Sequence, residues 1–160
     1  MRLRVLWFGR DARSPFEEQV AEYRQRVSRR WPAEDIALRP AAGGRGSDPR
    51  RALQIEAETL RPKLRAGWPL VVLDEAGRHL DSEAFARLFG GMEAKGVDGV
   101  VIAIGSDLGL EPALRRQAAV LLSLSPLTLP HLLARLLLWE QLYRATDILG
   151  SGVYHRRRVE

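Results

Sequence analysis

The sequence contains no cysteine and only three histidines. Without cysteine the chain has no disulfide framework, no thiolate zinc site and no cysteine nucleophile. This absence also fits a cytoplasmic protein, which is the localisation we expect. The histidines, at positions 79, 131 and 155, do not follow the spacing of metal ligands, so we expect no metal site.

Long hydrophobic runs are missing as well. The most apolar stretch, residues 118–139, is interrupted by serine, threonine, proline, His131 and Arg135, so we expect no transmembrane helix. The apolar run at residues 3–8 is too short for the core of a signal peptide and indicates a first strand instead. The sequence also lacks a phosphate-binding loop that ends in Lys-Ser or Lys-Thr, a complete dinucleotide fingerprint and a nucleophile elbow.

Lysine is nearly absent too: Lys63 and Lys95 are the only two, so arginine supplies most of the positive charge. The net charge of the 160 residues is +5, and the excess lies in the first part of the chain. Basic side chains outnumber acidic ones by six in residues 1–67, whereas acidic side chains exceed basic ones by one in residues 68–160. A basic half suits a polyanion such as RNA, although the arginine excess can also reflect codon usage. At this length we expect one domain over residues 1–160.

Strand-like and helix-like segments alternate along the chain. Short apolar runs predict five strands, at residues 3–8, 35–39, 69–74, 99–104 and 120–124. The remaining segments predict helices at residues 14–30, from 49 to Pro62, from 81 or 82 onward, at 111–119 and at 131–149. In the first helix, Ser14 is the expected N-cap and Glu17 completes a capping box. The alternation predicts an α/β fold with a mostly parallel sheet and helices on both faces.

The last predicted helix is apolar on nearly all sides, with leucine or tryptophan at most positions from 132 to 142. A helix of this kind cannot turn any face fully to water. In a chain of this size we therefore expect part of the helix to pack against a second copy, which makes the protein a homodimer.

The loops beyond the carboxyl ends of the predicted strands are the expected ligand site, as in other open α/β sheets. Three loops qualify: they follow Leu73, Ile104 and Leu124. Glycines at positions 105 and 109 let backbone amides approach a ligand closely, although a plain tight turn is the more common reason for such glycines. The third loop, residues 124–131, is apolar and stiffened by two prolines. Such a segment suits the wall of a pocket for a flat aromatic group such as adenine.

Four segments near the C-terminal end stand out together: residues 127–131 (Leu-Thr-Leu-Pro-His), Arg135, residues 142–145 (Leu-Tyr-Arg-Ala) and residues 154–156 (Tyr-His-Arg). This combination resembles the C-terminal signature of the RlmH family, the large-subunit (23S) ribosomal RNA pseudouridine N3-methyltransferases of the SPOUT superfamily. Weaker matches extend over the rest of the chain, at Gly9, Glu22, Tyr23, Arg26, residues 44–46, Leu73, Asp74, Ile104, Gly105 and Gly109. The loop at 105–109 reads Gly-Ser-Asp-Leu-Gly where the family usually has Gly-Gly-Pro-acid-Gly, a difference that bears on cofactor affinity.

The resemblance implies a SPOUT-type fold with a C-terminal trefoil knot, a homodimer with the active site at its interface, and S-adenosyl-L-methionine as cofactor. The implied substrate is a pseudouridine in a 23S stem-loop that faces the decoding centre of the assembled ribosome. The implied cofactor contacts are Leu73, Gly105, Leu124, Ser125, Pro126, Leu127, Thr128 and Leu129. The implied substrate contacts are His131, Arg135 and Arg144.

The resemblance favours three residues of the C-terminal tail as catalytic groups, and the chemistry of the reaction gives each of them a role. Methyl transfer from a sulfonium is an in-line displacement, and N3 of the pseudouridine ring must lose its proton to become a good nucleophile. The imidazole of His155 can take that proton, the guanidinium of Arg156 can stabilise the ring oxyanion, and Tyr154 can stack on a base. Two other functions stay open: a catalytically silent ribosome-binding protein of the same fold, and a domain that binds another nucleotide or a flavin.

Overall fold

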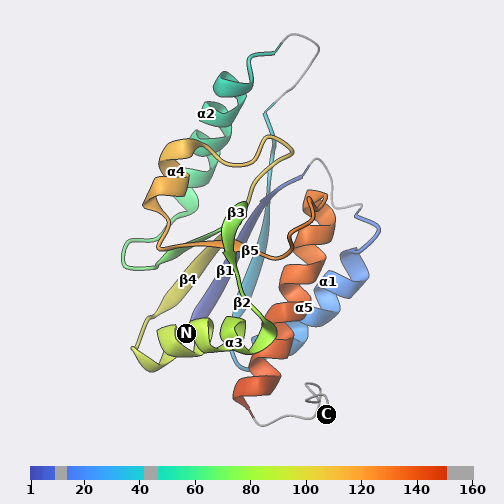
Figure 1. Cartoon of the computed structure of the whole chain (residues 1–160), viewed down its shortest axis with the longest axis vertical. Coiled ribbons are helices and arrows are strands. Elements are labelled where there is room, and N and C mark those ends of the chain that lie inside the picture. Colours follow the sequence, from blue (N-terminus) through green and yellow to red (C-terminus); the bar gives the residue numbers. More distant parts are fainter. Residues whose placement is uncertain (10–13, 42–46, 151–160) are drawn as a thin grey trace.

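The computed structural model describes residues 1–9, 14–41 and 47–150 of the chain. Helices and strands alternate through most of these residues (Figure 1). Their bounds are β1 (Arg2–Phe8), α1 (Glu17–Ser28), β2 (Ala33–Leu38), α2 (Pro49–Leu60), β3 (Leu70–His79), α3 (Ser82–Ala94), β4 (Gly99–Ile104), α4 (Pro112–Gln117), β5 (Val120–Ser123) and α5 (His131–Leu149). A short 3-10 helix that contains Pro62 follows α2, so the prediction that this proline ends the helix is confirmed.

The five strands form one sheet in the order β2-β1-β4-β3-β5, and every pairing in it is parallel. The predicted α/β class with a mostly parallel sheet is therefore confirmed. Strand β4 lies at the centre, and all six of its residues are buried. Its sequence, Gly-Val-Val-Ile-Ala-Ile, is the continuous apolar run that a strand covered on both faces requires.

Helices cover both faces of the sheet, as the alternation of the sequence predicts (Figure 1). Alternate residues of β1 point to opposite faces: Leu3, Val5 and Trp7 pack with α1, α3 and α5, whereas Leu6 and Phe8 pack with α2 and α4. Helix α5 contacts both α1 and α3, so it lies between them on the first face. Among the described residues, no helix is both long and apolar enough to cross a membrane.

Strand β3 runs past the point where the sequence predicts its end. The expected loop at 75–80 is wrong over most of its length, because β3 continues to His79. Leu73 pairs with Leu122 of β5, and after a bulge Arg78 pairs with the same residue. Glycine at position 77 permits this approach, since a Cβ there would lie 2.6 Å from the backbone carbonyl carbon of Leu122. The trefoil knot that the resemblance implies stays a prediction.

The start of α1 also differs from the prediction. The helix begins at Glu17 rather than near Ser14, and its N-cap is Phe16. The hydroxyl of Ser14 accepts a hydrogen bond from the backbone N–H of Phe16 (3.1 Å), which closes a turn before the helix. Glu17 does not complete a capping box, because its carboxylate is paired with Arg135 of α5.

Candidate functional site

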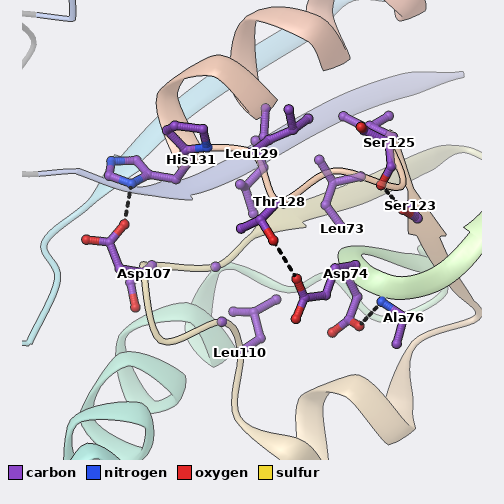
Figure 2. A pocket seen from close by; sticks show the side chains of 18 of the residues that line it. Leu73, Asp74, Ala76, Asp107, Leu110, Ser123, Ser125, Thr128, Leu129 and His131 are labelled. Atoms are coloured by element: carbon purple, nitrogen blue, oxygen red, sulfur yellow. Dashed lines mark hydrogen bonds and ion pairs between the residues drawn. The ribbon is translucent and has the colours of Figure 1, made fainter.

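A pocket of about 740 Å³ lies at the carboxyl ends of β4 and β5, where the middle of β3 passes the end of β4 (Figure 2). Its walls come from the loops that follow β4 and β5 and from residues 73–76 of β3, of which the sequence assigns the last two to a loop. The volume falls within the range of roughly 300–1,000 Å³ that is typical of small-molecule sites. Because parallel strands end at the same edge of the sheet, their loops converge there even though they are far apart in sequence.

The loop after β4 is a tight turn that leaves no room for a side chain at its first residue. A Cβ on Gly105 would lie 2.4 Å from the backbone of Gly109. The N–H of Gly109 donates to the carbonyl of Ser106 (2.8 Å), and Gly109 itself has a φ of +80°, which favours glycine. The glycines at 105 and 109 are therefore set by the geometry of the turn. The same geometry brings backbone rather than side chains to the pocket at Gly105.

The loop after β5 forms the apolar wall of the pocket. The hydroxyl of Ser123 donates to the carbonyl of Ser125 (2.9 Å), and the hydroxyl of Ser125 accepts from the N–H of Leu127 (2.9 Å). These two bonds fix the bend of the loop from within. The hydroxyl of Thr128 lies 3.4 Å from the carboxylate of Glu75, which connects the loop to β3 across the pocket (Figure 2).

An ion pair and a contact between a histidine and a carboxylate lie in the pocket wall. Asp74 directly follows the buried part of β3 and forms an ion pair with Arg115 of α4, in which Nε lies 2.7 Å from Oδ2. Nδ1 of His131, at the first position of α5, lies 3.0 Å from Oδ1 of Asp107 in the glycine turn (Figure 2). The Asp107 side chain is 88% exposed, so this second pair lies at the mouth of the pocket.

Glu56 of α2 is a buried carboxylate beside the glycine turn, with 3% of its surface exposed. Its Oε2 accepts from the hydroxyl of Ser106 (2.8 Å), and its Oε1 accepts from the backbone N–H of Ala41 (3.1 Å). Glu56 is not among the residues predicted for the site, because its neighbour Ile55 is the apolar residue at this point of the helix. In the structure Ile55 is 46% exposed, and Glu56 holds the buried position between Ala52 and Leu60.

Most of the residues predicted to contact a cofactor meet in this pocket. Its lining includes Leu73, Gly105, Leu124, Ser125, Leu127, Thr128 and Leu129. Pro126 belongs to the same loop but does not line the pocket. Asp74 and Arg115 line it as well and were not predicted as site residues, although Asp74 is marked in the sequence by its place at the end of a buried strand.

The predicted substrate-contacting residues do not lie together. His131 lines the pocket, whereas Arg135, one turn further along α5, points into the core and is 2% exposed. Arg144 lies near the other end of α5 and pairs with Glu140. A direct contact of Arg135 or Arg144 with substrate stays a prediction. The predicted catalytic residues Tyr154, His155 and Arg156, and the basic loop at 44–46, lie outside the described residues.

Arg135 is held by carboxylates from two other elements. Its Nη1 donates to Glu17 of α1 (2.8 Å), and its guanidinium also pairs with the buried Asp35 of β2. The centre of the guanidinium lies 4.0 Å from the ring centre of Trp7. Burial alone would lower the pKa of Arg135, but the hydrogen bonds to Glu17 and Asp35 outweigh it and raise that pKa. The hydrogen bond from Arg135 lowers the pKa of Glu17 in turn.

Comparison with known proteins supports the resemblance to the RlmH family over nearly the whole chain. Two relatives are each called "Ribosomal RNA large subunit methyltransferase H". The one from Rhizobium meliloti (strain 1021) is 40% identical over 159 residues, which cover 98% of this chain and 99% of the relative. The one from Pelobacter propionicus is 37% identical over 155 residues, which cover 97% and 99%.

A solved structure, a probable methyltransferase from Bordetella pertussis Tohama I, matches with a TM-score of 0.53 at 17% identity. The match covers 90% of this chain and 95% of that one, and it supports the fold alone. A family model described as "Predicted SPOUT methyltransferase" matches residues 1–155. The chain therefore belongs to the SPOUT methyltransferase family and, within it, to the RlmH family that its sequence resembles.

Proposed function

We propose that this protein transfers a methyl group from S-adenosyl-L-methionine to N3 of a pseudouridine in 23S ribosomal RNA, on the assembled ribosome. The observation that carries the proposal is the pocket at the carboxyl ends of β4 and β5 and the middle of β3, which gathers most of the residues expected to hold the cofactor. The names of the relatives, which are large-subunit ribosomal RNA methyltransferases, support the choice of substrate.

The residues of the pocket fit this cofactor. The backbone of Gly109 leaves no room for a side chain at position 105, so a ligand can approach the backbone of Gly105 directly. The leucines at 124, 127 and 129 supply an apolar wall for a flat ring, and backbone groups of the same loop can recognise the ring edge. When bound, S-adenosyl-L-methionine supplies an electrophilic methyl group on a positively charged sulfur.

The protein must position the acceptor ring and take up its N3 proton. We assign the proton transfer to His155, stabilisation of the ring oxyanion to Arg156 and base stacking to Tyr154. His131 lies at the mouth of the pocket, where an RNA base would enter, and its bond to Asp107 orients the imidazole. The basic first half of the chain suits the phosphate backbone around the site.

We also propose that the active form is a homodimer in which α5 contacts the second copy. Leu133 of α5 is 38% exposed, and Leu137, one turn later, is only half-buried. These side chains form an apolar strip that none of the described elements covers fully. Sedimentation at micromolar concentration should give a dimer, and a stable monomer would contradict this part of the proposal.

Isothermal titration with S-adenosyl-L-methionine, followed by transfer of a radiolabelled methyl group to ribosomes, tests the function. We expect the wild-type protein and His155→Ala to bind the cofactor equally, because we assign His155 to the proton transfer and not to cofactor binding. We expect methylation of 23S RNA by the wild type and its loss in His155→Ala. An absence of cofactor binding, with and without ribosomes, would refute the proposal and favour the silent ribosome-binding protein.

A further inference from the structure

Glu56 is a buried carboxylate that the proposed reaction does not use. With 3% of its surface exposed, it belongs to the few buried polar residues of the described chain. Removing a carboxylate from water is costly unless hydrogen bonds replace its hydration. The described residues supply two such bonds, from the hydroxyl of Ser106 (2.8 Å) and from the backbone N–H of Ala41 (3.1 Å). Both donors are neutral, so the arrangement is not an ion pair between these residues.

The two bonds connect Glu56 to two different loops at the same edge of the sheet. Ala41 lies in the segment that follows β2, and Ser106 lies in the turn that follows β4. Hydrogen bonds to a charged group are shorter and about twice as strong as those between neutral groups. A single side chain on α2 therefore holds both segments, and α2 itself does not line the pocket.

Ser106 transmits this restraint to the backbone of the glycine turn. Its hydroxyl donates to Glu56 and accepts from the N–H of Leu108 (3.3 Å), while its carbonyl accepts from the N–H of Gly109 (2.8 Å). The side chain thus reaches toward Glu56 of α2, and both Gly105 and Ser106 belong to the lining of the pocket. A glycine at position 106 would have no hydroxyl with which to make this connection.

We propose that Glu56 is a positioning residue for the cofactor site and acts through Ser106. The Glu56–Ser106 bond holds the turn at 105–109 in the conformation that presents its backbone to the cofactor. This inference rests on the proposed function, because it takes the pocket to be the S-adenosyl-L-methionine site. The inference gives a role to Ser106, which stands where the family usually has a second glycine. Its hydroxyl bonds the turn to Glu56, and the turn lacks the proline that the family usually has.

The test measures binding of S-adenosyl-L-methionine and of S-adenosylhomocysteine by isothermal titration, together with thermal unfolding of each variant. Ser106→Ala removes the hydroxyl and leaves the bond between Glu56 and Ala41 intact. We expect it to weaken both ligands about three- to tenfold, the effect of one hydrogen bond. We expect a lower unfolding midpoint as well, because the buried Glu56 then keeps only the described bond from Ala41.

Two further variants separate positioning from general stability. Glu56→Gln keeps the shape of the side chain, and its amide can accept from Ala41 and donate to Ser106, so we expect it to bind within about threefold of wild type. Glu56→Leu makes neither bond and should bind about tenfold more weakly or worse. In the Glu56→Leu background, adding Ser106→Ala should have no further effect, since the connection is already broken.

Ser82→Ala is the matched control. The hydroxyl of Ser82 donates to the side chain of Gln141 (2.8 Å), which is the same kind of bond but connects α3 to α5 away from the pocket. We expect its cofactor affinity to equal that of the wild type. Equal affinities for Ser106→Ala and wild type, or equal losses in Ser106→Ala and Ser82→Ala, would overturn the inference. A wild-type protein that binds neither ligand would instead refute the proposed function.

Discussion

Replacing Arg135 with methionine should destabilise the protein strongly, because it leaves a buried carboxylate without its cation. Arg135 is 2% exposed and the side chain of its partner Asp35 is 3% exposed. After the change, the remaining described partner of Asp35 is the indole N–H of Trp139, at 3.3 Å. Removing one member of a buried ion pair typically costs about 3–5 kcal/mol, and the stacking on Trp7 is lost in addition.

The assay is chemical and thermal unfolding of the wild type and of Arg135→Met at the same protein concentration. For a chain of this length, the expected loss lowers the melting temperature by about 6–20 °C. Arg87→Met is the matched control, because Arg87 pairs with Glu83 on the surface of α3 at 3.6 Å and should cost less than about 0.5 kcal/mol. An unfolding free energy for Arg135→Met within about 1 kcal/mol of this control would refute the reasoning.

The same change should alter the pH dependence of stability. The hydrogen bond from Arg135 lowers the pKa of Glu17 below its ordinary value of 4.5, although partial burial opposes it. Stability from this group is therefore complete above about pH 4.5 and is lost as the pH falls through the lower, folded-state pKa. In Arg135→Met, the loss of folding stability that comes from protonation of Glu17 in acid should disappear. A second variant that adds Asp35→Asn should recover part of the stability at pH 7, since it removes the unpaired charge.

Three further predictions concern glycines and a buried indole. Gly105→Ala should weaken S-adenosyl-L-methionine binding by about tenfold or more, measured by titration, since its Cβ would lie 2.4 Å from Gly109; Gly91→Ala, with nothing within 4 Å, is the control. Gly77→Ala should lower the unfolding free energy by about 1–3 kcal/mol, because its Cβ would meet the β5 backbone at 2.6 Å; a neutral result in denaturant unfolding would contradict the described register. Glu93→Ala should cost about 1–3 kcal/mol at pH 7, because the buried Trp31 indole loses its acceptor at 2.8 Å. Burial raises the pKa of Glu93, but hydrogen bonds from Arg30 and Trp31 outweigh it and hold the pKa below 4.5, so this difference should shrink in acid; an unchanged difference at pH 3 would contradict it.

The sequence predicts the elements of this fold well because their signals are local. Continuous apolar runs locate β4 and the buried part of β3, and α5 has the bounds that its apolar pattern predicts, His131–Leu149. Of the two residues at which the sequence lets α3 begin, 81 and 82, Asp81 is the cap, and its side chain accepts from the N–H of Ala84. The order of the loops along a parallel sheet then predicts the place of the pocket.

The features that the sequence does not predict depend on partners far away in the chain. The extension of β3 to His79 follows from pairing with β5, which cannot be read from residues 75–80 alone. Nothing in the sequence around Glu56 indicates that it is buried, because it is a polar residue directly after the apolar Ile55. Glu17 fits a capping box by its spacing, yet its partner Arg135 lies 118 residues away. Tertiary contacts here outweigh local preferences.

The separation of Arg135 from Asp35 also has a consequence for how the protein is made. Asp35 leaves the ribosome early, whereas its cation is on the last helix, 100 residues later. Until α5 emerges, β2 cannot be covered without burying an unpaired carboxylate, so the first part of the sheet has reason to stay open to water. A messenger that is cut short before α5 yields a chain that keeps this defect permanently. Such a chain would be a ready substrate for cellular proteases.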